Sequence, residues 1–122
     1  DRFPYDEGML VKMIQLADKL TVAYTHEKTE KWQWFEPILA YDNGLLPASL
    51  LHVYQKTEDE KYRKIAEESM TFLESVVFKE DHLSLVGNRY WYRKGQTRSQ
   101  YDQQPIDAMA MVVYYNTAYA VL

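Results

Sequence analysis

Three acidic residues of this chain stand beside aromatic or carboxamide residues, a combination that suits the binding or protonation of sugar hydroxyls. Glu36 follows an aromatic pair, and Asp42 and Asp102 each follow a tyrosine and precede a carboxamide. Glycoside hydrolysis uses two carboxyl groups at a set separation, one of them often with a raised pKa. Aromatic neighbours would withdraw water from the Glu36 carboxylate and raise its pKa. We therefore predict Glu36, Asp42 and Asp102 as catalytic candidates.

Each of these acids also has a structural alternative. An aspartate just before a helix accepts a backbone N–H of the first turn and is favoured by the helix dipole, which would account for Asp42 or Asp102. Glu36 could be a loop residue that pairs with Arg89 or Arg98. The sequence leaves these alternatives open.

The sequence predicts four helical segments, and these are expected to position the acids. The expected fold is therefore all-α and built of antiparallel helical hairpins, with a small β-hairpin in the loop before the last helix. The expected helices run over about 6–24, 43–55, 57–79 and 105–122. Thr57 and Glu60 form a capping box for the third helix, and Pro105 suits the first turn of the fourth. Residues 106–113 are apolar on nearly every side, so we expect the fourth helix to be enclosed.

Two long connections, about 25–42 and 80–104, hold every tryptophan and much of the polar signature. Loops of this length in a compact domain are usually functional when their composition is not that of a disordered segment. If the helices alternate in direction, both connections emerge at one end of the bundle. Within the second connection, 83–86 and 89–93 are expected to pair as a small β-hairpin. The predicted substrate-binding residues are Trp32, Trp34, Tyr41, Asn43, Asn88, Arg89, Trp91, Tyr101, Gln103 and Gln104.

The acidic motifs repeat along the chain. Asp42 and Asp102 both stand in the order aromatic, Asp, carboxamide, and an apolar run containing a proline follows each. A fixed period is the mark of an architecture whose units stack to bury a shared core. The spacing equals one helical hairpin with a long loop. We expect at least one polar group of 102–104 to face a ligand beside Glu36 or Asp42, with Asp107 a turn further in as a bracing residue.

These motifs occur in an order that resembles one family. The segments are Trp32-Gln33-Trp34-Phe35-Glu36, Tyr41-Asp42-Asn43 with Leu46-Pro47-Ala48-Ser49-Leu50-Leu51, Val86-Gly87-Asn88 with Trp91-Tyr92, and Asp102-Gln103-Gln104-Pro105. Over roughly 30–122 the chain resembles the six-hairpin (α/α)-toroid domains of bacterial proteins described as glycosyltransferases, and more distantly the six-hairpin glycosidases and sugar 2-epimerases. The resemblance implies that the chain forms about a third of a toroid. It also implies that the two long connections line the end of the ring where the sugar binds. Asp107 stands where the family pattern after Gln-Gln-Pro has a glutamate, and its shorter side chain argues against a catalytic role at that position.

Composition limits the other classes of function. The net charge of −4 and the pI near 5.3 argue against a nucleic-acid partner. No cysteine is present, the three histidines lack metal spacing, and no phosphate-binding loop occurs, so we expect neither metal nor cofactor. No apolar run is long enough to span a bilayer, and no signal-peptide pattern opens the chain, so we expect a cytoplasmic domain. Arg89, Arg93, Lys94 and Arg98 form a basic cluster suited to an anionic sugar or phosphate.

The expected function is that of a carbohydrate-active domain associated with a glycosyltransferase, acting on or holding a glycan. The alternatives are a glycan-binding module without catalysis and a helical-repeat scaffold for protein partners. The chain begins without Met and stops within an apolar helical pattern, so we expect a fragment of a longer protein. Its exposed helical flanks would then favour self-association.

Overall fold

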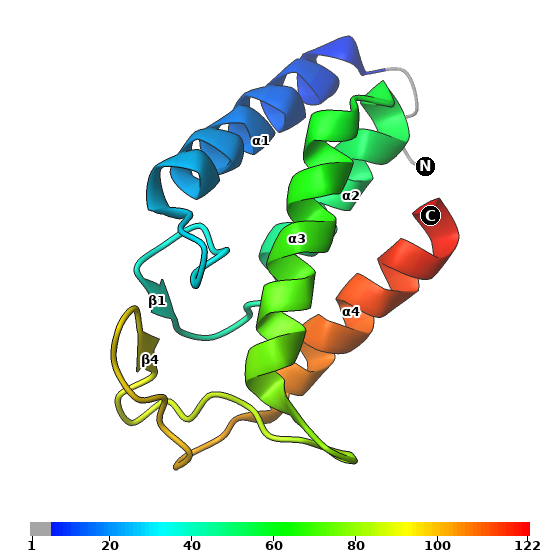
Figure 1. Cartoon of the computed structure of the whole chain (residues 1–122). Coiled ribbons are helices and arrows are strands. Elements are labelled where there is room, and N and C mark those ends of the chain that lie inside the picture. The colour runs from blue at the N-terminus through cyan, green and yellow to red at the C-terminus, as the bar shows by residue number, and fades with distance from the viewer. Residues whose placement is uncertain (1–5) are drawn as a thin grey trace.

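A computed structural model describes residues 6–122, and over that range it contains four helices and four short strands (Figure 1). In chain order these are α1 (Glu7–Glu27), β1 (Ile38–Leu39), α2 (Leu45–Thr57), α3 (Glu60–Val77), β2 (Phe78–Lys79), β3 (His82–Leu83), β4 (Tyr92–Arg93) and α4 (Pro105–Val121). The four predicted helices are confirmed, with α1 extending three residues beyond the expected end.

The start of α3 differs from the prediction. Asp59, not Thr57, is its N-cap, and the Asp59 side chain accepts a hydrogen bond from the backbone N–H of Lys61 at 3.0 Å. The Thr57 hydroxyl donates instead to the carbonyl of Val53 at 2.9 Å, which places Thr57 in the last turn of α2. The predicted capping box of Thr57 and Glu60 is therefore wrong, because a nearer aspartate satisfies the same amide groups.

Helix α2 lies at the centre of the helical packing. It packs against both α3 and α4 and also contacts α1, and α1 in turn contacts α3. Leu50 and Leu51 of α2 and Ala66 of α3 are fully buried between these helices. Burying one leucine side chain contributes about 1.5–3 kcal/mol, so the interface around α2 supplies much of the stability of the fold.

The two long connections meet at one end of the bundle. Strand β1 pairs antiparallel with β4, with Ile38 opposite Arg93 and Leu39 opposite Tyr92. Figure 1 shows this small sheet away from the turn that joins α2 to α3. The prediction that both loops lie at the same end is confirmed.

The predicted hairpin of 83–86 with 89–93 is wrong in its partners. Strand β4 pairs with β1, and a smaller hairpin joins β2 to β3. The backbone of 85–88 is already engaged elsewhere, because Gly87 N donates to Ser99 O at 2.9 Å and Asn88 N donates to Asp102 O at 3.1 Å. Segment 99–102, and not the predicted 89–93, is therefore the hydrogen-bonding partner of residues 87 and 88.

Helix α4 is covered on one face and exposed on the other. The covered face carries Asp107, Ala110, Met111, Tyr114 and Thr117. On the opposite face Val112 is 67% exposed and Tyr119 is 94% exposed. The expectation that α4 is enclosed is therefore wrong for the described residues. The helix is apolar on nearly every side, but other elements pack against one side only. Helix α1 likewise exposes large apolar side chains, among them Leu16 and Val22.

Candidate functional site

The two Tyr-Asp-carboxamide motifs form matching turns, one before α2 and one before α4. Asp42 has a φ of 55° and Asp102 a φ of 60°, a left-handed conformation that aspartate tolerates better than most residues. The amide of Asn43 donates to the carbonyl three residues earlier at 3.2 Å, and the amide of Gln103 does the same at 3.3 Å. The repeat in the sequence is thus also a repeat in backbone geometry.

Neither aspartate caps its helix. The N-cap of α2 is Gly44 and that of α4 is Gln104, and neither residue makes a side-chain capping bond. The capping alternative for Asp42 and Asp102 is therefore wrong. Their type is explained by the left-handed turn, which leaves the two carboxylates available for other contacts.

The turn of Asp42 and Asn43 lies against Asp107, which is in the first turn of α4. Asp107 is 6% exposed, and one carboxylate oxygen of each residue is buried without a hydrogen-bond partner. Burial raises the pKa of Asp107 to about 6, the Asp42 charge acts in the same direction, and the backbone N–H groups of Asp42 and Asn43 oppose the rise. The sequence did not predict this pair. Its one signal was an acid in the first turn of an otherwise apolar helix.

Glu36 does not have the setting that the sequence suggested. Its side chain is exposed, whereas the neighbouring Trp34 and Phe35 are buried in the core. The backbone carbonyl of Glu36 accepts a hydrogen bond from the Trp32 indole at 2.8 Å. The expected desolvation of this carboxylate is therefore not observed, because the adjacent aromatic rings point away from it.

Two of the predicted sugar-binding tryptophans belong to the core. Trp32 is 2% exposed and packs edge-on against Phe72 and Tyr92, with ring centroids 5.0 Å and 5.2 Å away. Trp34 is fully buried, and Asn43 is also buried. A ligand cannot reach these side chains, so Trp32, Trp34 and Asn43 are withdrawn as binding residues. Their role is to hold the first long connection against α3.

The remaining predicted residues contribute to an exposed surface at the loop end of the bundle. We call the exposed or half-exposed residues Tyr41, Asn88, Arg89, Trp91, Tyr101, Asp102 and Gln104 the loop-end surface. The rings of Tyr41 and Trp91 lie 6.4 Å apart, and Trp91 N donates to the carbonyl of Gly87 at 3.0 Å. Gly87 packs directly on the backbone of Tyr101, which connects the two turns through one continuous set of contacts.

The side chain of Gln103 makes hydrogen bonds within the protein, whereas that of Asp102 makes none within residues 6–122. The Gln103 side chain accepts from Leu85 N at 3.0 Å and also donates to a backbone carbonyl, so Gln103 is a structural residue and is withdrawn as a ligand contact. The Asp102 carboxylate is exposed and has no hydrogen bond or ion pair within residues 6–122. Asp102 and Gln104 are thus the polar residues of this motif whose side chains make no hydrogen bond within residues 6–122.

The predicted basic cluster separates in the structure. Lys94 Nζ donates to the carbonyl of Glu27 at 2.6 Å at the end of α1. Arg98 donates to the carbonyls of Val76 and Ser84, so it closes the C-terminal end of α3. Arg89 and Arg93 are exposed. The four cations therefore do not form one site.

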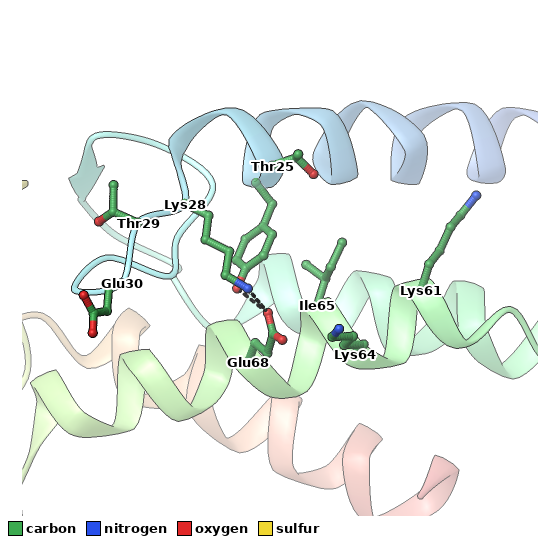
Figure 2. Close-up of a pocket in the computed structure, with 9 residues that line it drawn as sticks. Thr25, Lys28, Thr29, Glu30, Lys61, Lys64, Ile65 and Glu68 are labelled. Atoms are coloured by element: carbon green, nitrogen blue, oxygen red, sulfur yellow. Dashed lines mark hydrogen bonds and ion pairs between the residues drawn. The ribbon is translucent and has the colours of Figure 1, made fainter.

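A cleft of about 520 Å³ lies between α1 and α3 (Figure 2), and none of its lining residues belongs to the loop-end surface. Figure 2 shows Lys28 and Glu68 reaching across it, with Nζ and Oε2 2.7 Å apart. The Tyr24 hydroxyl donates to the same Glu68 oxygen at 2.8 Å, and Lys61 pairs with Asp18 at 3.1 Å. Lys28 and Lys61 are therefore paired within the protein, whereas Lys64 also lines the cleft; the paired charges make it a polar link between two helices.

Comparisons with known proteins add no family assignment. No family model, curated protein sequence or solved structure matches the chain. In the part of the chain that the structure describes, no helix is long and apolar enough to cross a membrane, and no group of three or more His, Cys, Asp or Glu is arranged to hold a metal ion. The interpretation of the site therefore depends on its own geometry.

Proposed function

We propose that this chain is a glycan-binding domain of a carbohydrate-active protein, and that its ligand lies on the loop-end surface. One observation carries the proposal. Two matching turns, sixty positions apart, place the exposed rings of Tyr41 and Tyr101 and the free carboxylate of Asp102 at the same end of the helices.

The chemistry of these groups suits a sugar. A tyrosine ring offers an apolar face for the C–H side of a sugar ring, and its hydroxyl remains able to bond. Carboxylate and carboxamide groups accept or donate hydrogen bonds to the hydroxyls at the ring edge. Tyr41 is 59% exposed and Tyr101 is 72% exposed, so both rings can be reached from solvent.

The helical arrangement supports a wider proposal, that the four helices form part of an (α/α) toroid attached to a bacterial glycosyltransferase. In such a ring, inner helices contact inner helices and outer helices contact outer ones. Here α2 packs against α4, and α1 contacts α3. A cytoplasmic location belongs to the same proposal. The link from fold to activity is an analogy, and the loop-end residues carry the functional argument.

Binding can be tested by isothermal titration with a panel of neutral oligosaccharides of glucose, mannose and galactose. Tyr41→Ala and Tyr101→Ala should each weaken the tightest ligand by about tenfold, the equivalent of about 1.4 kcal/mol of lost ring contact. Tyr119→Ala is the matched control, because Tyr119 is an exposed tyrosine on α4 outside this surface. Equal affinity in all three variants, or no binding by the unmodified protein to any member of the panel, would refute the proposal.

Catalysis is the second candidate function, and it makes a separate prediction. Glu36→Gln and Asp102→Asn keep size but remove the charge, so a hydrolytic role for either residue requires loss of turnover with the binding affinity largely kept. The measurement is the release of reducing sugar from whichever oligosaccharide binds. Turnover by the unmodified protein that both variants retain would exclude these two acids from the chemistry.

A further inference from the structure

A second pocket, of about 550 Å³, lies beside the C-terminal end of α3, where three distant parts of the chain meet. Its walls come from the connection between α1 and β1, from the end of α3 with β2, and from the segment around β4. Three cations line it, namely Lys31, Lys79 and Arg98. Among the described residues that form its lining there is no aspartate or glutamate.

Arg98 gives this pocket a fixed positive charge. Its Nη1 donates to the carbonyls of Val76 and Ser84, and its Nη2 donates to the hydroxyl of Ser84, all of which are neutral acceptors. The third nitrogen, Nε, is buried and has no hydrogen-bond partner. Burial lowers the pKa of Arg98, yet arginine remains protonated in proteins. A half-buried guanidinium without a carboxylate therefore leaves both its charge and one donor uncompensated.

The two lysines of the pocket are also unpaired. Lys31 and Lys79 are exposed, and neither side chain makes a hydrogen bond or ion pair within residues 6–122. The cleft between α1 and α3 offers a direct comparison, because there Lys28 and Lys61 pair with acidic side chains. In a chain with a net charge of −4, a pocket lined by cations without acids concentrates positive potential at one place.

The remaining lining residues suit an oxyanion attached to a ring. Thr97 supplies a hydroxyl group and Gln96 supplies a carboxamide, while the Ser75 hydroxyl already donates to the carbonyl of Phe72 at 2.6 Å. Phe78 and Tyr92 supply aromatic surface at the same pocket. Such a set can surround a carboxylate or phosphate with donors while an adjacent ring packs on the aromatic side chains.

We propose that this pocket binds the carboxylate or phosphate group of a small anionic ligand through Arg98, Lys31 and Lys79. Carboxylate and phosphate present the same oxygen acceptors to these donors. The inference does not depend on the proposed glycan function, because the pocket and the loop-end surface share no residue.

The experiment is a ¹H–¹⁵N NMR titration of the whole chain at constant ionic strength, with inorganic phosphate, glucuronate and neutral glucose as separate probes. Saturable shifts confined to residues lining the pocket, with phosphate, glucuronate or both but not with glucose, would support the proposal. The responding probe identifies the preferred group. Absence of saturable shifts in the pocket with both anions would overturn it, and retained binding of neutral oligosaccharides at the loop end would show that only this inference had failed.

Variants sharpen the titration. The double substitution Lys31→Gln and Lys79→Gln should weaken the responding anion by about tenfold, since two exposed cations each contribute modestly to an ion pair. The matched control is Lys12→Gln with Lys19→Gln, which removes the same charge from exposed positions on α1. Equal weakening by both pairs would overturn the proposal in favour of a general effect of net charge. Arg98 is left unchanged because its bonds also hold the end of α3.

Discussion

The pair of Asp42 and Asp107 predicts an unusual dependence of stability on pH. Most acids that are hydrogen-bonded in a folded protein lose their stabilising effect when they are protonated. Asp107 should behave in the opposite way, because it is buried beside another carboxylate and its pKa is raised to about 6. The perturbation that isolates this effect is Asp107→Asn, which keeps the size of the side chain and removes its titration.

The sign and the magnitude follow from the two pKa values. Between its ordinary pKa of 3.8 and the folded value of about 6, Asp107 binds more proton in the folded state than in the unfolded state. Its contribution is therefore fully present below about pH 4 and is lost as the pH rises through 6. A rise from 3.8 to about 6 corresponds to at most about 3 kcal/mol of unfolding free energy.

The assay is urea unfolding followed by circular dichroism at several values between pH 4 and pH 7.5. The quantity of interest is the unfolding free energy of the unmodified protein minus that of Asp107→Asn, since other titrating groups cancel in this difference. Asp18 and Glu68, whose pKa values are lowered by their partners, are among the groups that cancel. The difference should fall by up to about 3 kcal/mol across the range, with unchanged m-values.

Two further variants test the cause. Asp42→Asn removes the charge that helps to raise the Asp107 pKa, so the fall should become smaller in that background. Asp102→Asn is the matched control, because Asp102 has the same left-handed backbone in the equivalent turn but is exposed. The reasoning is refuted if the difference between the unmodified protein and Asp107→Asn is independent of pH or grows as the pH rises.

Close approach and exposed apolar surface give two more predictions. A Cβ on Gly44 would lie 2.5 Å from the carbonyl oxygen of Ala110, so Gly44→Ala should destabilise the protein by about 1–3 kcal/mol in urea unfolding. A Cβ on Gly95 would meet no atom within 4 Å, so Gly95→Ala should lower the unfolding free energy by about 1 kcal/mol, through the residue's φ of 77° alone. Equal losses of stability in Gly44→Ala and Gly95→Ala would contradict the close packing of Gly44 on α4. Val112 is 67% exposed on α4, so the chain should associate as concentration rises in sedimentation velocity. Val112→Glu should reduce the association, whereas Gln100→Glu, which adds the same charge at an exposed position outside α4, should not. A monomer at every concentration would contradict this expectation.

The helices were predictable because local signals agree with their packing. Most residues of the apolar repeat of α3 are buried in the structure, including Tyr62, Ile65 and Leu73. Alternation of helix direction was then enough to place both long connections at one end. The boundaries depended on smaller energies, and Asp59 took the capping role because it lies two residues closer to α3 than Thr57.

The candidate site was less predictable because it depends on which face of each loop is buried. The sequence does not distinguish a loop tryptophan that lines a ligand site from one that packs on the core. Trp32 and Trp34 pack on the core. An aspartate before a helix usually indicates a cap, whereas Asp42 and Asp102 serve a left-handed turn. The contact of Asp42 with Asp107 crosses from one repeat to the next, so no local pattern could reveal it.

The placement of the acids favours binding over hydrolysis. A glycosidase needs two carboxyl groups that face a shared space about 5–9.5 Å across and wide enough for the sugar. The structure brings Asp42 and Asp107 together, but Asp107 is 6% exposed and lies under the turn. Glu36 and Asp102 are both exposed, whereas the general acid of a glycosidase needs an apolar setting that raises its pKa. Exposed tyrosines with a free carboxylate therefore fit a surface that holds a glycan, and the buried pair fits a contact that fixes the turn on α4.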